Sequence, residues 1–200
     1  YKSLSDYRAN EQAQLTQIIA EAKQAIDAAT TNDEVDAAVA AAKVKADKVK
    51  TNAQLTAEEE AFAAKKAQAK KEIEEFKSLS DYRADEQAKL TQIVTEAKQA
   101  IDAATTNDAV NAAVAAAKTK AEALKTKAAL DREDAQKVQE VIDAIGDVTL
   151  DSKEAIEKAR EAYDALPEDV RILVGNFDKL LSAEQTYEEK ETAAFNHKVA

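Results

Sequence analysis

The residues with the greatest potential for chemistry are one histidine and several groups of carboxylates. His197 is the only histidine, and acid–base or metal chemistry at an imidazole needs a second group within reach. Its chain neighbours are Asn196 and Lys198, so we interpret His197 as an exposed residue near a helix end. The chain has no cysteine, which excludes a thiolate nucleophile, a disulfide and a zinc–sulfur site.

Carboxylates are dense at Glu58–Glu60 and Glu188–Glu189. A catalytic carboxylate pair needs a pocket that shifts its pKa, whereas these side chains alternate with lysines at helical spacing, as on a solvated helix face. The segment 147–151 carries two carboxylates beside Gly146 but lacks the Asp-x-Asp-x-Asp-Gly pattern of a calcium loop, so we expect a helix connection there. The sequence therefore predicts a non-enzymatic protein with no catalytic residues, metal site or cofactor.

The elements that carry these residues are predicted to be helices throughout. The 200 residues include only two Gly and one Pro, and Ala, Glu, Lys, Gln and Leu dominate.

The net charge of −11 argues against binding to nucleic acid and against binding to an anionic membrane surface. No apolar run approaches the roughly 20 residues that span a bilayer. The chain starts at Tyr1 rather than Met, so we expect a piece of a longer protein with targeting signals outside it.

A long internal repeat organises the first two thirds of the chain. Lys2–Thr51 aligns with Lys77–Thr126 without a gap, and about 40 of the 50 positions are identical. Apolar residues at spacings of three and four predict two helices per copy. Thr31 with Glu34 reads as a capping box between them, whereas in the second copy Thr106 or Asn107 must cap alone.

A third helix is predicted to follow each hairpin. Thr56 with Glu59 reads as its capping box, with Phe62, Ala69, Ile73 and Phe76 on its apolar face, and Asp131 with Asp134 replaces that cap in the second copy. Because residues 56–104 contain no Gly or Pro, we expect one continuous or slightly kinked helix into the second copy. A break at Ser78 or Ser80 is the alternative. Tyr7 and Tyr82 are equivalent residues of the two copies, at positions where the apolar stripe is interrupted, and we expect them to pack at the junction between units rather than bind a partner.

The last third of the chain is predicted to form a divergent helical module. Val138–Ile145 gives one helix that Gly146 ends, and Asp151 or Ser152 caps the next. Pro167 stops that helix and starts a short turn of helix before a last helix. The spacing of Tyr163, Phe177, Tyr187 and Phe195 predicts that these aromatic side chains belong to the core. The helix over 131–145 closes the second unit, opens the third, or does both.

Two segments resemble known modules. The hairpin AIDAATTND(E/A)V(D/N)AAVAAAK resembles helical repeats of large cell-wall-anchored proteins of Gram-positive bacteria, including the matrix-binding-protein type, and the resemblance covers roughly residues 1–130. The segment VIDAIGDVTLDSKEAIEKAREAYDALPEDVRILVGNFDKLLSAEQTY resembles a helical module of secreted multi-modular Firmicutes proteins, glycoside hydrolases included. Related modules of such proteins bind albumin, immunoglobulin or matrix components, but no ligand-contact residue can be carried over to this sequence.

These observations predict an all-α chain of tandem three-helix bundles in an elongated, spectrin-like array with long linking helices. The expected units are 1–76, 77–130 and 131–200. We expect an extracellular region, cell-wall-anchored or secreted, that is monomeric within a longer chain and binds host proteins such as immunoglobulin, albumin or fibronectin. The alternative is a passive spacer in a multi-modular surface protein or a secreted glycoside hydrolase.

Overall fold

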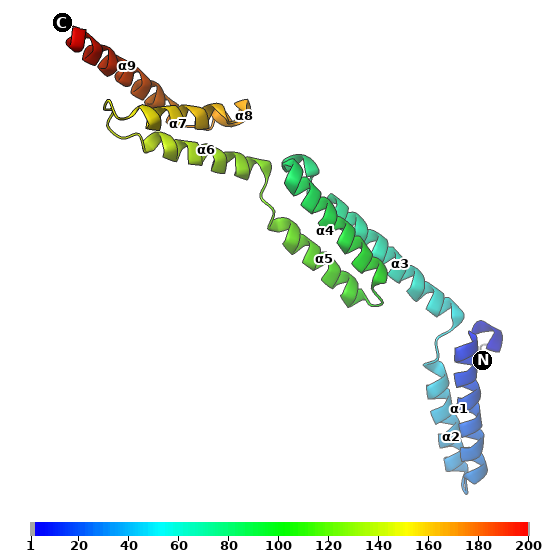
Figure 1. Cartoon of the computed structure of the whole chain (residues 1–200). Coiled ribbons are helices and arrows are strands. Elements are labelled where there is room, and N and C mark those ends of the chain that lie inside the picture. Colours follow the sequence, from blue (N-terminus) through cyan, green and yellow to red (C-terminus); the bar gives the residue numbers. More distant parts are fainter. Residues whose placement is uncertain (1–2, 200) are drawn as a thin grey trace. The chain divides into compact units, whose positions relative to one another are not determined.

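The computed structural model describes residues 3–199, and within them it is all-helical, with no strand (Figure 1). The prediction of an all-α chain is therefore confirmed. In chain order the elements are the 3-10 helix η1 (Leu4–Asp6), α1 (Ala9–Ala28), α2 (Asn32–Asp47), α3 (Asn52–Glu75), the 3-10 helix η2 (Leu79–Asp81), α4 (Ala84–Ala103), α5 (Asn107–Glu122), α6 (Lys127–Asp143), α7 (Lys153–Asp164), α8 (Glu168–Arg171) and α9 (Phe177–Val199).

The sequence repeat is also a repeat of structure. Helices α1 and α4 each have 20 residues, α2 and α5 each have 16, and each pair begins 75 positions apart. The predicted capping box before α2 is confirmed, because the Thr31 hydroxyl accepts the Glu34 amide and the Glu34 carboxylate accepts the Thr31 amide. Before α5, Thr106 caps alone by accepting the Ala109 amide at 3.2 Å.

The expected continuous helix into the second copy is wrong. Helix α3 ends at Glu75 and α4 begins at Ala84, with η2 between them. Tyr82 and Arg83 stand outside both flanking helices, and the Gln87 side chain donates to the Tyr82 carbonyl at 2.9 Å. The break therefore falls at the alternative position, next to Ser78 and Ser80. It needs no Gly or Pro because the Gln87 side chain and the backbone hydrogen bonds of η2 satisfy backbone groups freed by the break.

The predicted start of the third helix is also wrong. Helix α3 begins at Asn52, where Thr51 and Gln54 form the reciprocal hydrogen bonds of a capping box. Helix α6 begins at Lys127 behind Thr126, whose hydroxyl accepts the Ala129 amide at 3.3 Å. Both helices therefore start five residues earlier than the sequence predicted. The residues read as caps, Thr56 with Glu59 and Asp131 with Asp134, lie inside helices.

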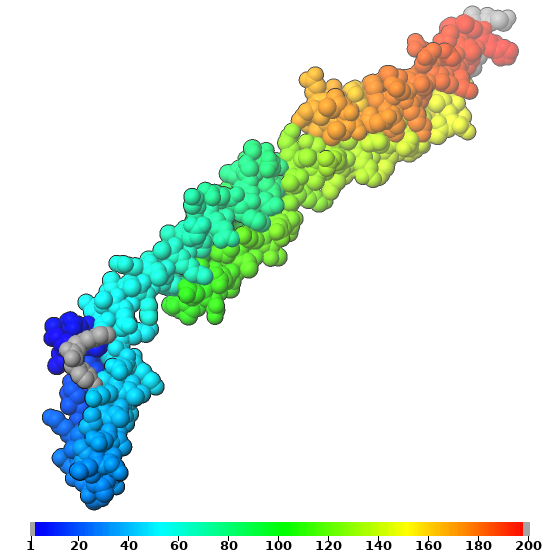
Figure 2. All heavy atoms as spheres, turned by 180° about the vertical axis from the view of Figure 1, so that it is seen from behind, coloured from blue at the N-terminus to red at the C-terminus, as the bar shows by residue number. Residues whose placement is uncertain are grey.

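Contacts divide the chain into two compact units, 1–72 with 100–112 and 73–99 with 113–200. In the first unit α1 and α2 form a helical hairpin, visible as a close-packed pair in Figures 1 and 2. The predicted grouping of the helices into three-helix bundles over 1–76, 77–130 and 131–200 stays a prediction, as does the spectrin-like array.

The C-terminal part of the second unit has an extended hydrophobic core. Helix α6 packs against α7, α8 and α9, and the buried residues of this core are Ala135, Val138, Ile142, Ile145, Ile156, Ala159, Val170, Val174, Leu180 and Ala183. Tyr163 and Phe177 stack with ring centroids 4.1 Å apart and, like Tyr187, pack against the core as predicted. Phe195 does not, because its exposed fraction is 66%.

The connections of this module agree with the sequence at Gly146 and Pro167, but the predicted cap of α7 by Asp151 or Ser152 is wrong. Helix α6 ends at Asp143, and Gly146 then adopts a positive φ of 60° in the turn. Ser152 precedes α7, but its hydroxyl accepts the Thr149 amide instead of capping α7. Pro167 precedes the single turn of α8, as predicted.

Candidate functional site

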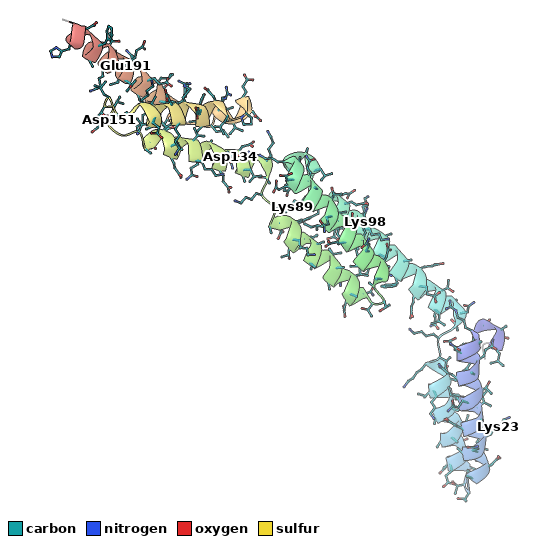
Figure 3. The ribbon with its side chains drawn as sticks, in the orientation of Figure 1. Lys23, Lys89, Lys98, Asp134, Asp151 and Glu191 are labelled. Atoms are coloured by element: carbon teal, nitrogen blue, oxygen red, sulfur yellow. The ribbon has the colours of Figure 1, made fainter. Side chains whose placement is uncertain are left out.

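The residues singled out for possible chemistry do not converge in the structure. His197 lies on α9 and is exposed, as predicted. Glu58–Glu60 are exposed on α3, and Asp147 and Asp151 lie in the connection between α6 and α7, where Figure 3 labels Asp151. Over residues 3–199 no group of His, Cys, Asp and Glu could hold a metal ion.

Arginine residues that sequence reasoning missed hold the start of each repeat in place. Arg8 precedes α1, and its guanidinium bonds to three side chains of α3: Asn52 at 3.0 Å, Thr56 at 3.2 Å and Glu59 at 2.6 Å. A second nitrogen reaches the other Glu59 oxygen at 2.9 Å, so this ion pair is bidentate. The hydrogen bonds from Arg8 lower the pKa of Glu59. We call this arrangement an arginine clasp.

The second copy builds the same clasp with different acceptors. Arg83 bonds to Asp131 at 2.5 Å and to Asp134 at 2.8 Å, both on α6. These positions lie 75 residues after Thr56 and Glu59 (131 − 56 and 134 − 59). The Arg83 hydrogen bond, assisted by Lys137, lowers the pKa of Asp134, and the two carboxylates raise the pKa of Arg83.

The clasps explain why the prediction of helix caps at Thr56 with Glu59 and at Asp131 with Asp134 is wrong. A Thr or Asp followed three residues later by an acid is the pattern of a capping box, but the same spacing puts two acceptors on one helix face. A second signal was available in the sequence, because an Arg precedes each copy's first helix and an acid follows it 51 residues later in both. The sequence reasoning did not pair them, since nothing local connects residues so far apart.

The equivalent tyrosines have different surroundings. Tyr82 is buried with Leu90 and Ala121, and Phe76 and Leu124 pack against this cluster. This agrees with the expected packing role. Tyr7 is only half-buried and borders an open groove instead.

That groove runs over the hairpin of α1 and α2 and has a volume of about 730 Å³. We call it the α1–α2 groove. Its lining is mainly apolar, and it consists of Leu4, Tyr7, Leu15, Ile18, Ile19, Ala22, Lys23, Ile26, Val39, Ala42, Lys43, Ala46 and Asp47. Ile19 is 50% exposed, so the hairpin presents an apolar surface of a kind that marks interaction sites.

Several matching residues of α4 and α5 are more deeply buried. Ile26 is half-buried, whereas Ile101, its equivalent, has no exposed surface. The same difference separates Val35 from Val110. Because the two hairpins are nearly identical in sequence, the difference must come from what packs on them.

The chain was also compared with family models, curated proteins and solved structures, and none of these matches it. The resemblance to surface-protein modules therefore stays a prediction. Among the described helices, none is both long and apolar enough to cross a membrane.

Proposed function

We propose that this chain is a non-enzymatic, extracellular region of a bacterial surface or secreted protein that presents repeated helix faces to host or matrix proteins. Immunoglobulin, albumin and fibronectin are the candidate ligands. Copies joined in series raise the effective concentration of a weak binding face, so many weak contacts give a tight attachment.

The observation that carries this proposal is the arginine clasp, built twice at the same place in the repeat. Arg8 and Arg83 each fix the start of a hairpin to a helix that follows it. Because the contact between the hairpin and the following helix is repeated together with the hairpin itself, many copies of the repeat can be connected in series in the same way. Exposed apolar side chains such as Ile172, at 81% exposure, supply contact area.

Surface plasmon resonance on immobilised albumin, immunoglobulin and fibronectin tests the proposal. The 200-residue chain and a tandem of two such chains are passed over each surface. We expect binding to at least one protein, with an apparent affinity about 10- to 100-fold higher for the tandem, because linked copies can engage two immobilised ligands at once. Lack of binding of both chains to all three proteins argues against the proposal.

A second candidate is a passive spacer, which the ion pairs around each join favour. Lys50 bonds to Glu58 at 2.7 Å across the turn before α3, and the equivalent Lys125 bonds to Glu133 at the same distance. Because the chain lacks cysteine, spin labels can be placed specifically at exposed Ala13 and Ala63. A rigid spacer requires a narrow distribution of distances between the two labels. A broad distribution excludes the spacer role and leaves the ligand-binding proposal untouched.

A further inference from the structure

We infer that the α1–α2 groove is a docking site for an amphipathic helix with the chemistry of α3, supplied by another copy of the repeat. This homotypic contact goes beyond the proposed function, since it concerns how copies of the repeat recognise each other and not which host protein they bind.

The second half of α3 shows how such a helix is held. Lys66 donates to the Asp102 carbonyl at 2.9 Å, and Lys70 pairs with the Asp102 carboxylate. Further along, Glu74 pairs with Lys98. Two lysines of α3, at positions 66 and 70, therefore contact an acid of α4, and the acid at position 74 contacts a lysine of α4.

Aliphatic side chains of α3, and the aromatic ring of the residue that follows it, accompany these ion pairs. Ala69 and Ile73 are buried, with 6% and 4% exposure. Phe76 packs against the cluster of Tyr82, Leu90 and Ala121, and the Lys118 ammonium lies 5.0 Å from its ring centroid. The α3 sequence thus combines an apolar stripe with charges that fix its position.

The α1–α2 hairpin carries the same receiving groups. Subtracting 75 from Lys98, Asp102 and Lys118 gives Lys23, Asp27 and Lys43, so all three residue types are unchanged. Lys23 and Lys43 line the α1–α2 groove, and Figure 3 labels Lys23 on α1 and Lys98 on α4. Among residues 3–199 none of Lys23, Asp27 and Lys43 has an ion-pair partner, which leaves their charges available.

The apolar surface between these charges is also of the right kind. The groove has a volume of about 730 Å³, and it is bordered by Tyr7, Leu15 and Ala46. Their equivalents are Tyr82, Leu90 and Ala121, the residues that receive Phe76. An amphipathic helix laid in an apolar groove and fixed by flanking charges is a recurring recognition mode.

The order of charges favours this occupant over others. An anionic lipid surface is disfavoured by the net charge of −11. An unrelated protein helix need not carry Lys, Lys, Glu and an aromatic ring at positions 1, 5, 9 and 11. The repeat itself does so at Lys66, Lys70, Glu74 and Phe76, and in the repeat register Tyr1 takes the place of Phe76.

The test joins residues 52–75 directly in front of Tyr1 of the full chain, which recreates the sequence context that precedes α4. Hydrogen exchange of the α1–α2 amides is then measured with and without the added helix. We expect protection at residues 18–26 and 35–43 to rise at least about tenfold, toward that of the matching amides in α4 and α5. Unchanged protection overturns the inference.

Charge reversal identifies the contact. Asp27→Lys is expected to abolish the gain in protection. In that variant, replacing the two added lysines that correspond to Lys66 and Lys70 by Glu is expected to restore the protection. An added helix of the same composition in scrambled order is the control, and equal protection by it also overturns the inference. Protection of the groove by albumin or immunoglobulin, with none from the added helix, would refute homotypic docking and leave the proposed function intact.

Discussion

Arg8 and Arg83 occupy a position where a helix ordinarily has a capping side chain, but neither caps its own helix. Arg8 has the extended backbone of an N-cap residue and makes no side-chain capping bond. Its guanidinium instead satisfies acceptors on a helix that lies 44 to 51 residues later in the chain. At the residue scale, a guanidinium has only donors and cannot accept the free amides at a helix start, so each arginine instead fixes the relation between two helices.

The Arg83 clasp should contribute measurably to stability. Arg83→Ala removes hydrogen bonds to Asp131 and Asp134 and leaves Asp131, 8% exposed, without its main partner. We expect the free energy of unfolding to fall by about 1–2 kcal/mol, as for a partly buried charged network. Urea denaturation followed by circular dichroism measures this. Arg132→Ala, an exposed change beside Asp131, is the control, and equal effects of both variants would contradict a role for the clasp.

The clasps also predict acid sensitivity. The fold lowers the pKa of Glu59 and of Asp134, mainly through hydrogen bonds from Arg8 and Arg83. A lowered folded-state pKa gives stability that is present above the ordinary values of 4.5 and 3.8 and is lost as pH falls through the folded value. Glu59→Gln and Asp134→Asn should therefore lower the thermal midpoint at pH 7 and match the wild type near about pH 2. Glu60→Gln, exposed on α3, should have no effect at either pH, and a pH-independent deficit would contradict the account.

At the scale of elements, identical hairpins in different surroundings permit a matched comparison. Ile101→Ala opens a cavity in a site with no exposed surface, whereas Ile26→Ala changes a half-buried residue beside the α1–α2 groove. We expect Ile101→Ala to cost about 3 kcal/mol and Ile26→Ala less than half of that. Urea denaturation of both variants checks the difference. Equal costs would mean that the two hairpins are equally packed in solution.

The sequence predicted the helices, the α2 capping box and the C-terminal turns because each depends on neighbouring residues. Thr31 and Glu34 are three residues apart, and Pro167 acts on its own backbone. It did not predict the break before α4, since Ser78–Arg83 contains neither Gly nor Pro and is held partly by Asp131, 48 residues later. Nor could it predict which hairpin is covered, because Ile26 and Ile101 have the same local sequence.

At the scale of the whole molecule, stability should differ along the chain even though the sequence repeats. Helix α6 joins the Arg83 clasp, through Asp131, to the core of α7, α8 and α9, so it serves both the second repeat and the C-terminal module. The α1–α2 hairpin has no such core, since Leu15 is its only buried residue on α1 and α2 has none. Local openings should therefore begin at the hairpin.

Hydrogen exchange on the unmodified chain tests this directly. Amides 22–29 and 97–104 lie in the same sequence, AKQAIDAA, so their intrinsic exchange rates match and any difference reports on structure. We expect the amides of 97–104 to be protected at least about tenfold more than those of 22–29, because burial of Ile101 and Ala104 opposes local opening. Equal protection of the two segments would show that the α1–α2 groove is closed in solution. Homotypic docking needs an open groove, so this result would also contradict the docking inference.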